Sequence, residues 1–411
     1  MENIVHYLAL ALAALLVVRM IVMVAGAIQR FSHSKRVIAL EAETFAHRLV
    51  LTKKEQQRRT ASENKWNGNR KFSVSKVVEE CSLVKSFYLK PHDRKSIPGF
   101  KPGQFLTFQI PNLGSDTRVN RCYSLSDGPG GDTYRVTIKR VPDGLVSNWF
   151  HDQVDEGTIL DVKAPAGGFY LDTLKASPIV LVAGGVGITP LMSMLAEIKA
   201  TQPNREVWFF YGVRNRSEHI LAEAIDTSSN GLTHFHRHIC YSKPTEKCSK
   251  GDVYDHEGRV TLDLIKKHLP SNNYVFYICG PSKLMSDMVE GLRDWGVPEK
   301  DIQREAFGPA SVTGANKPSP IDENTKVEFK RSGKIFDWKP EGKDASILQL
   351  ACQNQIKNID ATGCHAGNCG TCQTAIQSGE FEYVREPGCQ VETGSFLPCI
   401  AVPKGHLKID A

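Results

Sequence analysis

Four cysteines near the C-terminal end of the chain have a spacing that could hold an iron–sulfur cluster. Four residues separate Cys364 from Cys369, two separate Cys369 from Cys372, and Cys399 follows at a distance. One loop can therefore wrap three thiolates round a metal cluster while a distant turn supplies the fourth, which is the plant-type [2Fe–2S] spacing. Three glycines between residues 363 and 370 allow the tight bends that such a loop needs.

A tetrahedral zinc site is the alternative for these cysteines. Zinc ligands usually come as close pairs on both sides of the site, whereas Cys399 stands alone after Pro398. The spacing therefore favours iron and sulfide. Cys352 and Cys389 lie outside the pattern, and we interpret them as buried or incidental thiols. The eleven cysteines are otherwise thinly spread, which favours a reducing compartment over a disulfide scaffold.

A glycine-rich turn could bind a dinucleotide. Residues 180–190 read Val-Leu-Val-Ala-Gly-Gly-Val-Gly-Ile-Thr-Pro, an apolar strand that runs into a turn, and a helix is expected over residues 191–199. Such a turn presents backbone amides and a helix N-terminus to a pyrophosphate. Glycine turns after strands also serve packing alone, so this motif by itself leaves both interpretations open.

Two further elements offer groups for redox cofactors. Residues 277–281 read Tyr-Ile-Cys-Gly-Pro and put Cys279 at the carboxyl edge of a sheet, where ligands of open α/β folds bind. A buried structural cysteine is the alternative for such a position. Residues 121–124 read Arg-Cys-Tyr-Ser and offer a cation for a phosphate, an aromatic face for a flavin ring and a hydroxyl for its edge.

The elements that must position these groups change along the chain, whose 411 residues are too many for one core. Short alternating strands, such as residues 134–138, predict an antiparallel β-barrel over residues 70–174. Apolar strands that alternate with helical stretches predict a parallel α/β sheet over residues 175–310. A linker is expected at residues 311–325, and residues 326–411 form a third unit that contains the cysteine group.

The first thirty residues predict a transmembrane anchor. From Ile4 to Ile28 the sequence is almost wholly apolar and contains one charge, Arg19, and it is long enough to cross a bilayer as a helix. A cleaved signal peptide is the alternative, but Glu2 stands where a basic segment is expected and the apolar run is too long.

Residues 31–69 form a basic linker. Between Arg30 and Lys71 eleven Lys and Arg face four Glu, a local net charge of +7 against +6 for the whole chain. Basic residues after a spanning helix mark the cytoplasmic side. We therefore expect one pass through the inner (cytoplasmic) membrane, with the N-terminus outside and the catalytic domains in the cytoplasm. Residues 53–59 could equally contact anionic lipid or form a solvated helix, and the nearly neutral remainder argues against nucleic-acid binding.

Taken together, residues 70–411 resemble the ferredoxin–NADP reductase superfamily. The Arg-x-Tyr-Ser element, the Gly-Gly-x-Gly-x-Thr-Pro turn, the Cys-Gly-Pro element and the cysteine group occur in the family's order. The resemblance implies a flavin-binding β-barrel, an NAD(P)-binding α/β domain and a β-grasp ferredoxin domain. It implies FAD as the flavin, although FMN occurs in close relatives, and NADH or NADPH as the hydride donor.

The resemblance also implies roles for single residues. Arg121 would bind flavin phosphate, and Tyr123 would stack on the isoalloxazine ring. Ser124 would form a hydrogen bond near N5 of that ring. Glu305 and Phe307 would lie near the flavin. A second flavin-pyrophosphate element would comprise Gly144, Ser147 and Asn148. The nicotinamide dinucleotide would be held by Gly184, Gly185, Gly187, Thr189, Cys279, Gly280 and Pro281.

The order of domains is similar to that of the reductase components of multicomponent oxygenases and of the hybrid-cluster-protein and phenylacetyl-CoA-oxygenase reductases. It implies transfer of single electrons to a partner, which the anchor suggests is a membrane-associated oxygenase, hydroxylase or desaturase. In the flavin subunit of the sodium-pumping NADH:quinone reductase, which also has an N-terminal helix, the ferredoxin domain comes first. A membrane quinone reductase and a non-catalytic redox sensor remain as alternatives. Arg214 and Arg216 could meet the 2′-phosphate of NADPH or could simply be exposed.

Overall fold

A computed structural model divides the chain into two compact units, Met1–Thr60 and Ala61–Ala411. It describes residues 19, 20, 23, 66–111, 118–246, 248–251, 253–305, 307, 325–339, 346–356, 358–359, 363–384, 387, 389 and 391–411. Among these residues, no helix has the length and apolar character that crossing a bilayer requires. Apart from a few residues, the anchor predicted at 1–30 and the linkers predicted at 31–69 and 311–325 lie outside the described part.

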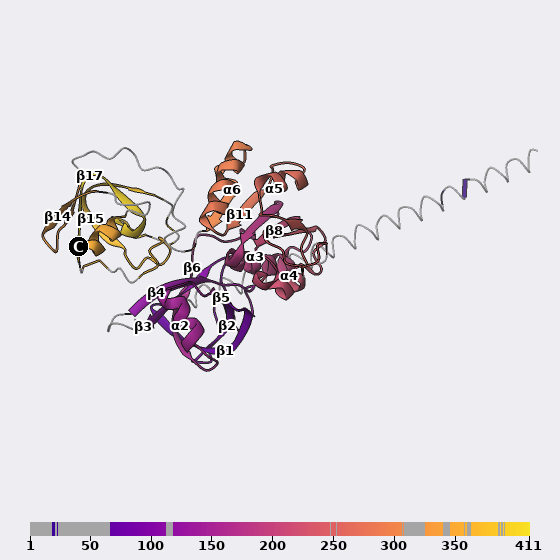
Figure 1. The fold of residues 1–411 in the computed structure, drawn as a ribbon, viewed down its shortest axis with the longest axis horizontal. Coiled ribbons are helices and arrows are strands. Elements are labelled where there is room, and N and C mark those ends of the chain that lie inside the picture. Colours follow the sequence, from indigo (N-terminus) through magenta and orange to yellow (C-terminus); the bar gives the residue numbers. More distant parts are fainter. Residues whose placement is uncertain are drawn as a thin grey trace, which may run out of the picture. The chain divides into compact units, whose positions relative to one another are not determined.

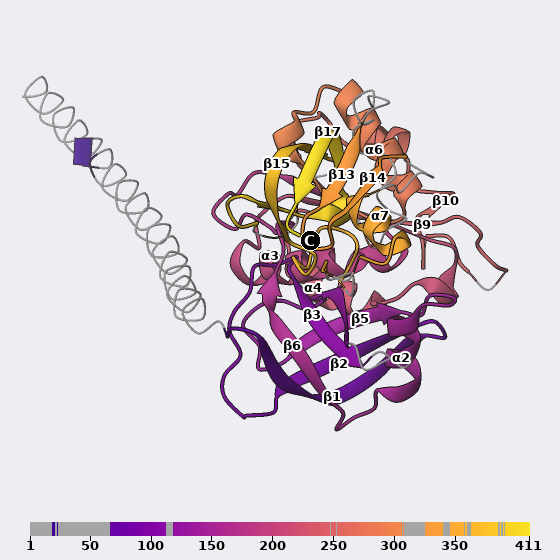
Figure 2. The ribbon, with the colours of Figure 1, turned by 90° about the vertical axis from the view of Figure 1, so that its left-hand side faces the viewer.

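The first folded region of the second unit is an antiparallel β-barrel, as predicted (Figures 1 and 2). Its sheet has the order β4-β3-β6-β1-β2-β5, and a bridge between Leu125 and Val136 joins the end of β4 to β5 and closes the barrel. The elements are β1 (Asn69–Cys81), β2 (Val84–Pro91), β3 (Phe105–Pro111), β4 (Arg118–Ser124), β5 (Tyr134–Lys139), α2 (Leu145–Gln153) and β6 (Ile159–Ala166).

Alternation of side chains along these strands fills the interior of the barrel. Phe72 and Val74 of β1 point inward and are buried, and Ser73 between them is half-buried. The helix α2 contributes Phe150, whose ring meets Phe87 at 5.3 Å and Phe108 at 5.2 Å between centroids, both edge-on. The pairing register is therefore fixed by the buried face, because a slip of one residue would turn it outward.

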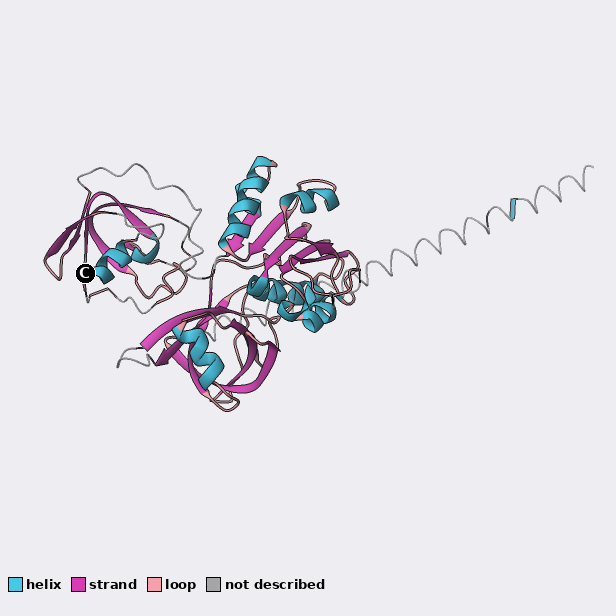
Figure 3. Ribbon diagram, viewed as in Figure 1, coloured by secondary structure: helices cyan, strands magenta, loops and turns pink. Residues whose placement is uncertain are grey.

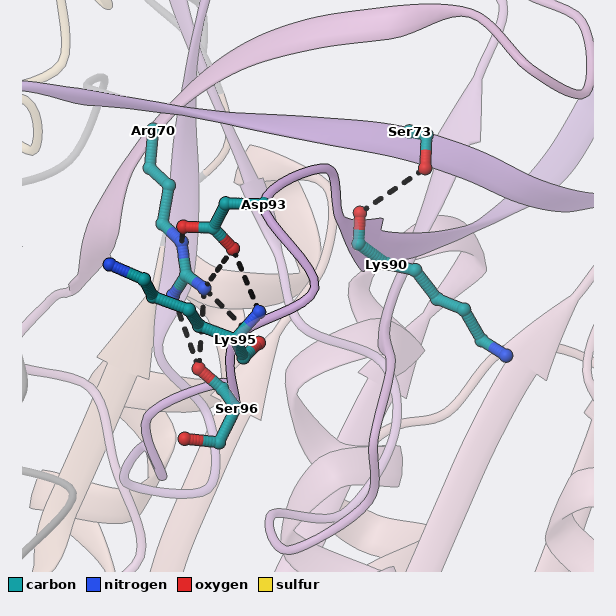
Figure 4. A network of polar contacts seen from close by, with 6 residues as sticks. All are labelled: Arg70, Ser73, Lys90, Asp93, Lys95 and Ser96. Carbon is teal, nitrogen blue, oxygen red and sulfur yellow. Dashed lines mark hydrogen bonds and ion pairs between the residues drawn. The ribbon is translucent and has the colours of Figure 1, made fainter.

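A polar cluster holds the start of the barrel in place (Figure 4). The guanidinium of Arg70 donates to both carboxylate oxygens of Asp93, at 2.7 and 3.1 Å, and to the Ser96 carbonyl at 3.2 Å. Its carbon also lies 5.5 Å from the centre of the Trp66 ring, whose Nε1 donates to the Val162 carbonyl at 2.9 Å. These contacts fasten the chain entering β1 to the barrel, since bidentate arginine–carboxylate pairs fix geometry as well as charge.

The second region is a parallel sheet with helices on both faces, again as predicted (Figure 3). Its order is β10-β9-β8-β7-β11-β12, so the strand order reverses between β7 and β11, where open α/β sheets bind ligands. The strands are β7 (Ile179–Gly184), β8 (Val207–Val213), β9 (Phe235–Tyr241), β10 (His256–Glu257), β11 (Val275–Cys279) and β12 (Ile302–Glu305). The helices are η1 (Gly185–Gly187), α3 (Ile188–Thr201), η2 (Arg216–Glu218), α4 (Ala222–Ser229), α5 (Leu262–His268), α6 (Ser282–Asp294) and η3 (Glu299–Asp301).

Each face of this sheet has its own apolar core. One core unites α3 and α4 with residues such as Leu181 and Phe209, and the other unites α5 and α6 with residues such as Val182 and Phe210. The central strand β7 is fully buried, which explains its unbroken apolar run in the sequence.

The third region is a five-stranded mixed sheet of order β14-β13-β17-β15-β16, in which β13 and β17 run parallel. Its elements are β13 (Lys326–Phe329), β14 (Lys334–Asp337), α7 (Ile347–Gln353), β15 (Thr374–Tyr383), β16 (Ser395–Phe396), η5 (Pro398–Ile400) and β17 (Ala401–Ile409). Ser346 caps α7 because its hydroxyl accepts from the Gln349 amide at 3.2 Å. Cys372 and Cys399 belong to the core of this region, so the cysteine group is built into its packing.

Candidate functional site

A cavity of about 290 Å³ is lined by residues from all three regions of the second unit. The strand β4 contributes three of its residues, the end of β12 contributes one, and residues 364–368 belong to the cysteine loop. Segments more than 180 residues apart in sequence thus share one cavity. The lining residues are Phe105, Arg121, Cys122, Ser124, Glu305, Phe307, Cys364, His365, Ala366 and Asn368.

Ser124 and Glu305 line this cavity, and the fully buried Cys279 lies next to Glu305 on the adjacent strand. The Ser124 hydroxyl donates to Oε2 of Glu305 at 3.4 Å, and Glu305 pairs with Cys279 across the parallel strands β12 and β11. Burial, and then the nearby charge of Glu305, raise the pKa of the Cys279 thiol well above its usual range. Cys279 is therefore a neutral thiol at physiological pH, which suits contact with an uncharged ring.

Tyr123 packs into the barrel wall. Its ring meets Phe150 at 5.4 Å, edge-on, and Phe108 at 5.9 Å between centroids. Burial raises the pKa of its phenol, so the hydroxyl stays protonated. The side chain is half-buried rather than enclosed, and its predicted stacking on a flavin ring stays a prediction.

Arg121 links the barrel to the cysteine loop. Its Nη1 donates to the Gly363 carbonyl at 2.6 Å and to the Asn120 carbonyl at 2.8 Å, and the neighbouring Asn120 amide donates to the Thr371 hydroxyl at 3.3 Å. The structure thus connects β4 to the loop by two side chains. The predicted phosphate contact of Arg121 remains a prediction.

The two predicted nucleotide turns pack directly against each other. A Cβ added at Gly187 would lie 2.2 Å from the Cys279 carbonyl oxygen, and one at Gly280 would lie 3.0 Å from the Gly184 nitrogen. One at Gly184 would come 2.7 Å from Pro281. These glycines are thus required by close approach of backbone, in addition to any contact with a dinucleotide.

Two other residues of this turn differ in how they are placed. Gly185 has a positive φ of 54°, and the space around a Cβ there is open. Thr189 is buried, and its hydroxyl donates to the Val186 carbonyl at 3.0 Å. Thr189 therefore stabilises the turn from inside, and its expected contact with the dinucleotide stays a prediction.

The predicted second flavin-pyrophosphate element forms the start of α2. Gly144 precedes the helix, and its carbonyl accepts from the backbone amide of Asn148 at 3.0 Å. The Ser147 hydroxyl accepts from the backbone amide of Val141 at 3.1 Å. No side-chain hydrogen bond among the described residues caps this N-terminus. Its amides can therefore meet an anion such as phosphate.

The cysteine loop points backbone amides at its sulfur atoms. Sγ of Cys364 accepts from the amides of residues 366, 368 and 369 at 3.3–3.4 Å, and Sγ of Cys369 accepts from the Cys364 amide at 3.2 Å. Cys372 and Cys399 are buried, and a hydrogen bond from Cys399 is the main cause of the lowered pKa of Cys372. Such a set of thiols, with amide donors to sulfur, fits an iron–sulfur cluster.

Two cysteines outside the predicted ligand set lie beside this loop: Cys122, which has no predicted role, and Cys389, which we interpret from the sequence as a buried or incidental thiol. The Cys122 thiol is within hydrogen-bonding reach of Cys364 and Cys369, and these contacts raise its pKa well above its usual range. Sγ of Cys389 lies 3.6 Å from the Gly367 carbonyl. The position of Cys122 between Arg121 and Tyr123 of the flavin element was a signal that could have directed attention to it.

Two protein-family models match the chain. The oxidoreductase FAD-binding domain matches residues 71–170, and the oxidoreductase NAD-binding domain matches residues 181–290. A flavohemoprotein of Bacillus cereus is 40% identical over 254 residues, which make up 61% of this chain and 63% of that protein. The chain thus spans less than two thirds of that relative. A flavohemoprotein of Halalkalibacterium halodurans is 34% identical over 289 residues, 67% of this chain and 70% of that protein.

A solved structure extends the similarity to most of the second unit. It is phthalate dioxygenase reductase, described as a modular structure for electron transfer from pyridine nucleotides to [2Fe–2S]. The TM-score is 0.53 at 25% identity, and the match covers 85% of this chain and 99% of that one.

The fold and the matched domains define an NAD(P)H-dependent oxidoreductase that carries FAD. The chain belongs to the family of FAD- and NAD-binding oxidoreductases of the ferredoxin-reductase type, which includes the flavohemoproteins that it matches.

Proposed function

We propose that this enzyme is an electron-transfer reductase that moves electrons from NAD(P)H through FAD to a [2Fe–2S] cluster held by Cys364, Cys369, Cys372 and Cys399. Single electrons then leave for a partner oxygenase, hydroxylase or desaturase. The observation that carries the proposal is the shared cavity, because flavin-motif residues and the loop of Cys364 line the same space.

The cavity is of a size for a ring system rather than for a whole dinucleotide. Its volume of about 290 Å³ is near the lower end of ordinary ligand pockets. The flavin ring would be held in this cavity, which Arg121, Ser124 and Phe307 help to line. The phosphates of the flavin would lie at the start of α2. The backbone amides after Gly144 can donate hydrogen bonds to an anion there.

The third region supports the cluster assignment on two grounds. Its strand order, in which the first and last strands along the chain (β13 and β17) run parallel beside the helix α7, supports the predicted β-grasp domain. Its thiols are gathered, and amides donate to two of the sulfur atoms. The similarity to phthalate dioxygenase reductase, which covers 85% of this chain, adds to both.

When bound, the flavin supplies conversion of a two-electron hydride into single electrons, and the cluster supplies a one-electron carrier. The protein residues supply position. The pair of Ser124 and Glu305 marks the flavin edge, and the packing of Gly187 against the Cys279 backbone sets where a nicotinamide could lie. Arg121 holds the Gly363 carbonyl and so fixes the start of the cysteine loop against the flavin motif.

We further propose that residues 1–30 anchor the enzyme in the inner membrane, with the catalytic domains on the cytoplasmic side and a membrane-associated redox partner. The support is the apolar run from Ile4 to Ile28 and the basic segment that follows it. Full-length enzyme should sediment with membranes, and removal of residues 1–36 should release an active reductase. Recovery of the full chain in the supernatant without detergent would contradict the anchor.

The electron path is tested by replacing one cluster ligand. Cys369→Ser should cripple the cluster, since a hydroxyl is a poor ligand for iron in place of a thiolate. NAD(P)H oxidation with ferricyanide, which reduced flavin can reduce directly, should stay within about twofold of the parent. Reduction of cytochrome c should fall by about tenfold or more, an order of loss expected when a metal centre fails.

The matched control is Cys352→Ser, because Cys352 is exposed and lies outside the cysteine loop. It should leave both activities and the visible and electron paramagnetic resonance spectra of the cluster unchanged. Parent-rate cytochrome c reduction by Cys369→Ser with the cluster spectra absent would show that the cluster is not the exit port. Reduction of membrane quinone by the parent without any protein partner would instead favour the quinone reductase.

A further inference from the structure

We propose that His238, His256 and His268 form a binding site for a divalent transition-metal ion on the nucleotide-binding sheet. One ring nitrogen from each histidine lies within 4.8 Å of the others. The three come from different elements, β9, the short strand β10 and the C-terminal residue of α5. None of them lines the flavin-site cavity, so the inference goes beyond the proposed electron-transfer function.

The three rings form a compact group. Their centroids are 4.2 Å apart for His238 and His268, 5.1 Å for His238 and His256, and 5.2 Å for His256 and His268. Nδ1 of His238 and Nε2 of His256 are 2.9 Å apart. Ligand nitrogens in a tetrahedral zinc site with bonds of about 2.0–2.1 Å lie about 3.4 Å from each other. Small side-chain rotations would therefore bring the three nitrogens to that separation.

Two ring nitrogens in the group lack hydrogen bonds. Within the described part of the chain, Nε2 of His238 and Nε2 of His268 are both buried and have no partner. A buried polar atom without a partner is costly and calls for an explanation such as an ion. Each histidine gives one nitrogen to an ion. An ion bound through Nε2 of His268 would satisfy one of these two atoms, and His238 would bind it either through its unpaired Nε2 or through the Nδ1 that faces His256.

Aromatic neighbours hold one of the rings firmly. His238 stacks on Phe210 at 4.7 Å and lies parallel to Trp208 at 5.8 Å between centroids. Its ring is therefore fixed in orientation by packing before any ion binds.

The charges nearby are mixed. Asp255, whose Oδ2 accepts from the Ile239 amide at 2.7 Å, lies close enough to raise the pKa of His238 and would stabilise a cation. Lys250 and Lys267 act in the opposite sense, because their charges are among the causes that lower the pKa of His256. The site therefore depends on direct bonds from three imidazoles rather than on net charge.

Three imidazoles select the kind of metal. Imidazole suits zinc, copper, iron and nickel, whereas magnesium and calcium need oxygen ligands. Three protein ligands leave a fourth position for water or another group. Such an ion would tie β10, which is only two residues long, and the end of α5 to β9. We therefore expect it to stabilise this edge of the sheet.

The test uses the full chain with its flavin and cluster loaded, so that the cluster cysteines are occupied. Cobalt(II) is the probe, because its absorption distinguishes nitrogen from sulfur ligands, and zinc(II) is then titrated by calorimetry. We expect one equivalent to bind, to raise the melting temperature and to give no sulfur-to-cobalt charge-transfer band. His256→Gln and His268→Gln should each weaken binding by about tenfold or more.

The matched control is His236→Gln, since His236 stacks on Trp208 at 3.9 Å beside the group but is not one of its three members. It should keep parent affinity. Parent flavin absorbance and ferricyanide activity in each variant establish that it is folded. Equal affinity in His256→Gln, His268→Gln and the parent would overturn the site, as would a charge-transfer band or the absence of a bound equivalent in the folded parent.

Discussion

The two halves of the candidate site are held by different kinds of force. The carboxyl edge of the parallel sheet is held by backbone packing, because Gly187 lies against the Cys279 carbonyl and Gly280 against Gly184. The cysteine loop is held by hydrogen bonds from amides to sulfur and by the burial of Cys372 and Cys399. The first half is built by close contact, and the second by thiols that we propose to hold a metal cluster.

This difference indicates how each half depends on its ligand. The sheet edge rests on apolar cores on both faces and should keep its shape when no nucleotide is bound. The core of the third region includes two of the four proposed cluster ligands, so loss of the metal would remove part of what holds that core together. Changes in the first half should act through shape, and changes in the second through metal.

The largest effect is expected from Gly187→Ala. The new methyl would lie 2.2 Å from the Cys279 carbonyl oxygen, a backbone atom that cannot rotate away. Overpacking of this kind costs about 1–3 kcal/mol, and a backbone clash belongs at the upper end. NAD(P)H oxidation with ferricyanide should fall at least about tenfold, and the melting temperature should fall with it.

Gly131→Ala is the control for this variant, because the nearest atom to its added methyl is at 3.8 Å, an ordinary contact. It should match the parent in activity and melting temperature. Parent-like turnover by Gly187→Ala would mean that the sheet edge is less tightly packed than its geometry indicates.

The second-largest effect is expected in the cysteine region, when a chelator removes the proposed cluster iron under reducing conditions. The region at residues 326–411 should become about tenfold or more sensitive to limited proteolysis, because metal binding there contributes to folding. The barrel and the parallel sheet should keep their flavin absorbance and their ferricyanide activity. Cleavage of the third region at equal rates with and without iron would show that its apolar core suffices.

Sequence alone predicted the two larger folds. The alternation around Tyr134 and the apolar run at β7 led directly to the barrel and the parallel sheet, because strand period and burial leave a local trace. The packing of Gly187 against Cys279 left no such trace, since the two residues are 92 positions apart and meet only after folding.

The same limit applies to the cysteine loop. Its spacing led to four proposed ligands, an assignment that stays a prediction. The contact of Cys122 with Cys364 and Cys369 could not be predicted, because it depends on how β4 meets the loop. The histidine group is similar, because three elements must be folded before their rings adjoin. Contacts between distant segments were thus the part that sequence reasoning could not reach.

A smaller effect is expected from Cys122→Ala, which tests a contact between the barrel and the loop. The Cys122 thiol lies within hydrogen-bonding reach of two proposed ligand sulfurs, and donors to sulfur help set the potential of a cluster. Because such a donor favours the more negative, reduced state, its removal should lower the reduction potential of the cluster. The shift should be measured by redox titration monitored by electron paramagnetic resonance.

Cys122→Ser is the companion to this variant, since a hydroxyl can also donate, and it should leave the potential closer to that of the parent. Cys240→Ala, at a buried cysteine in β9, controls for loss of a thiol elsewhere. A cluster potential that is the same in Cys122→Ala and the parent would mean that this thiol does not donate to the cluster ligands.

The smallest effect is expected in the nucleotide-binding region. There an exposed charge, rather than packing, would determine the preference for NADPH or NADH. Arg214 follows the end of β8, its side chain is 70% exposed, and it pairs with Glu218 at 3.6 Å. Exposed pairs of this kind contribute little to stability, about 0–1 kcal/mol, so the guanidinium can turn to a ligand.

The 2′-phosphate of NADPH is a suitable ligand for the Arg214 guanidinium. Arg214→Ala should therefore lower kcat/KM for NADPH by roughly fivefold, which corresponds to about 1 kcal/mol for one solvent-exposed hydrogen bond, and leave kcat/KM for NADH within about twofold. The control is Arg237→Ala on the neighbouring strand β9, which breaks an exposed ion pair with Asp226 of α4. It should change neither value. If Arg214→Ala lowers both values equally, Arg214 supports the shape of the loop rather than the choice of nucleotide. If it lowers neither value, another residue binds the 2′-phosphate.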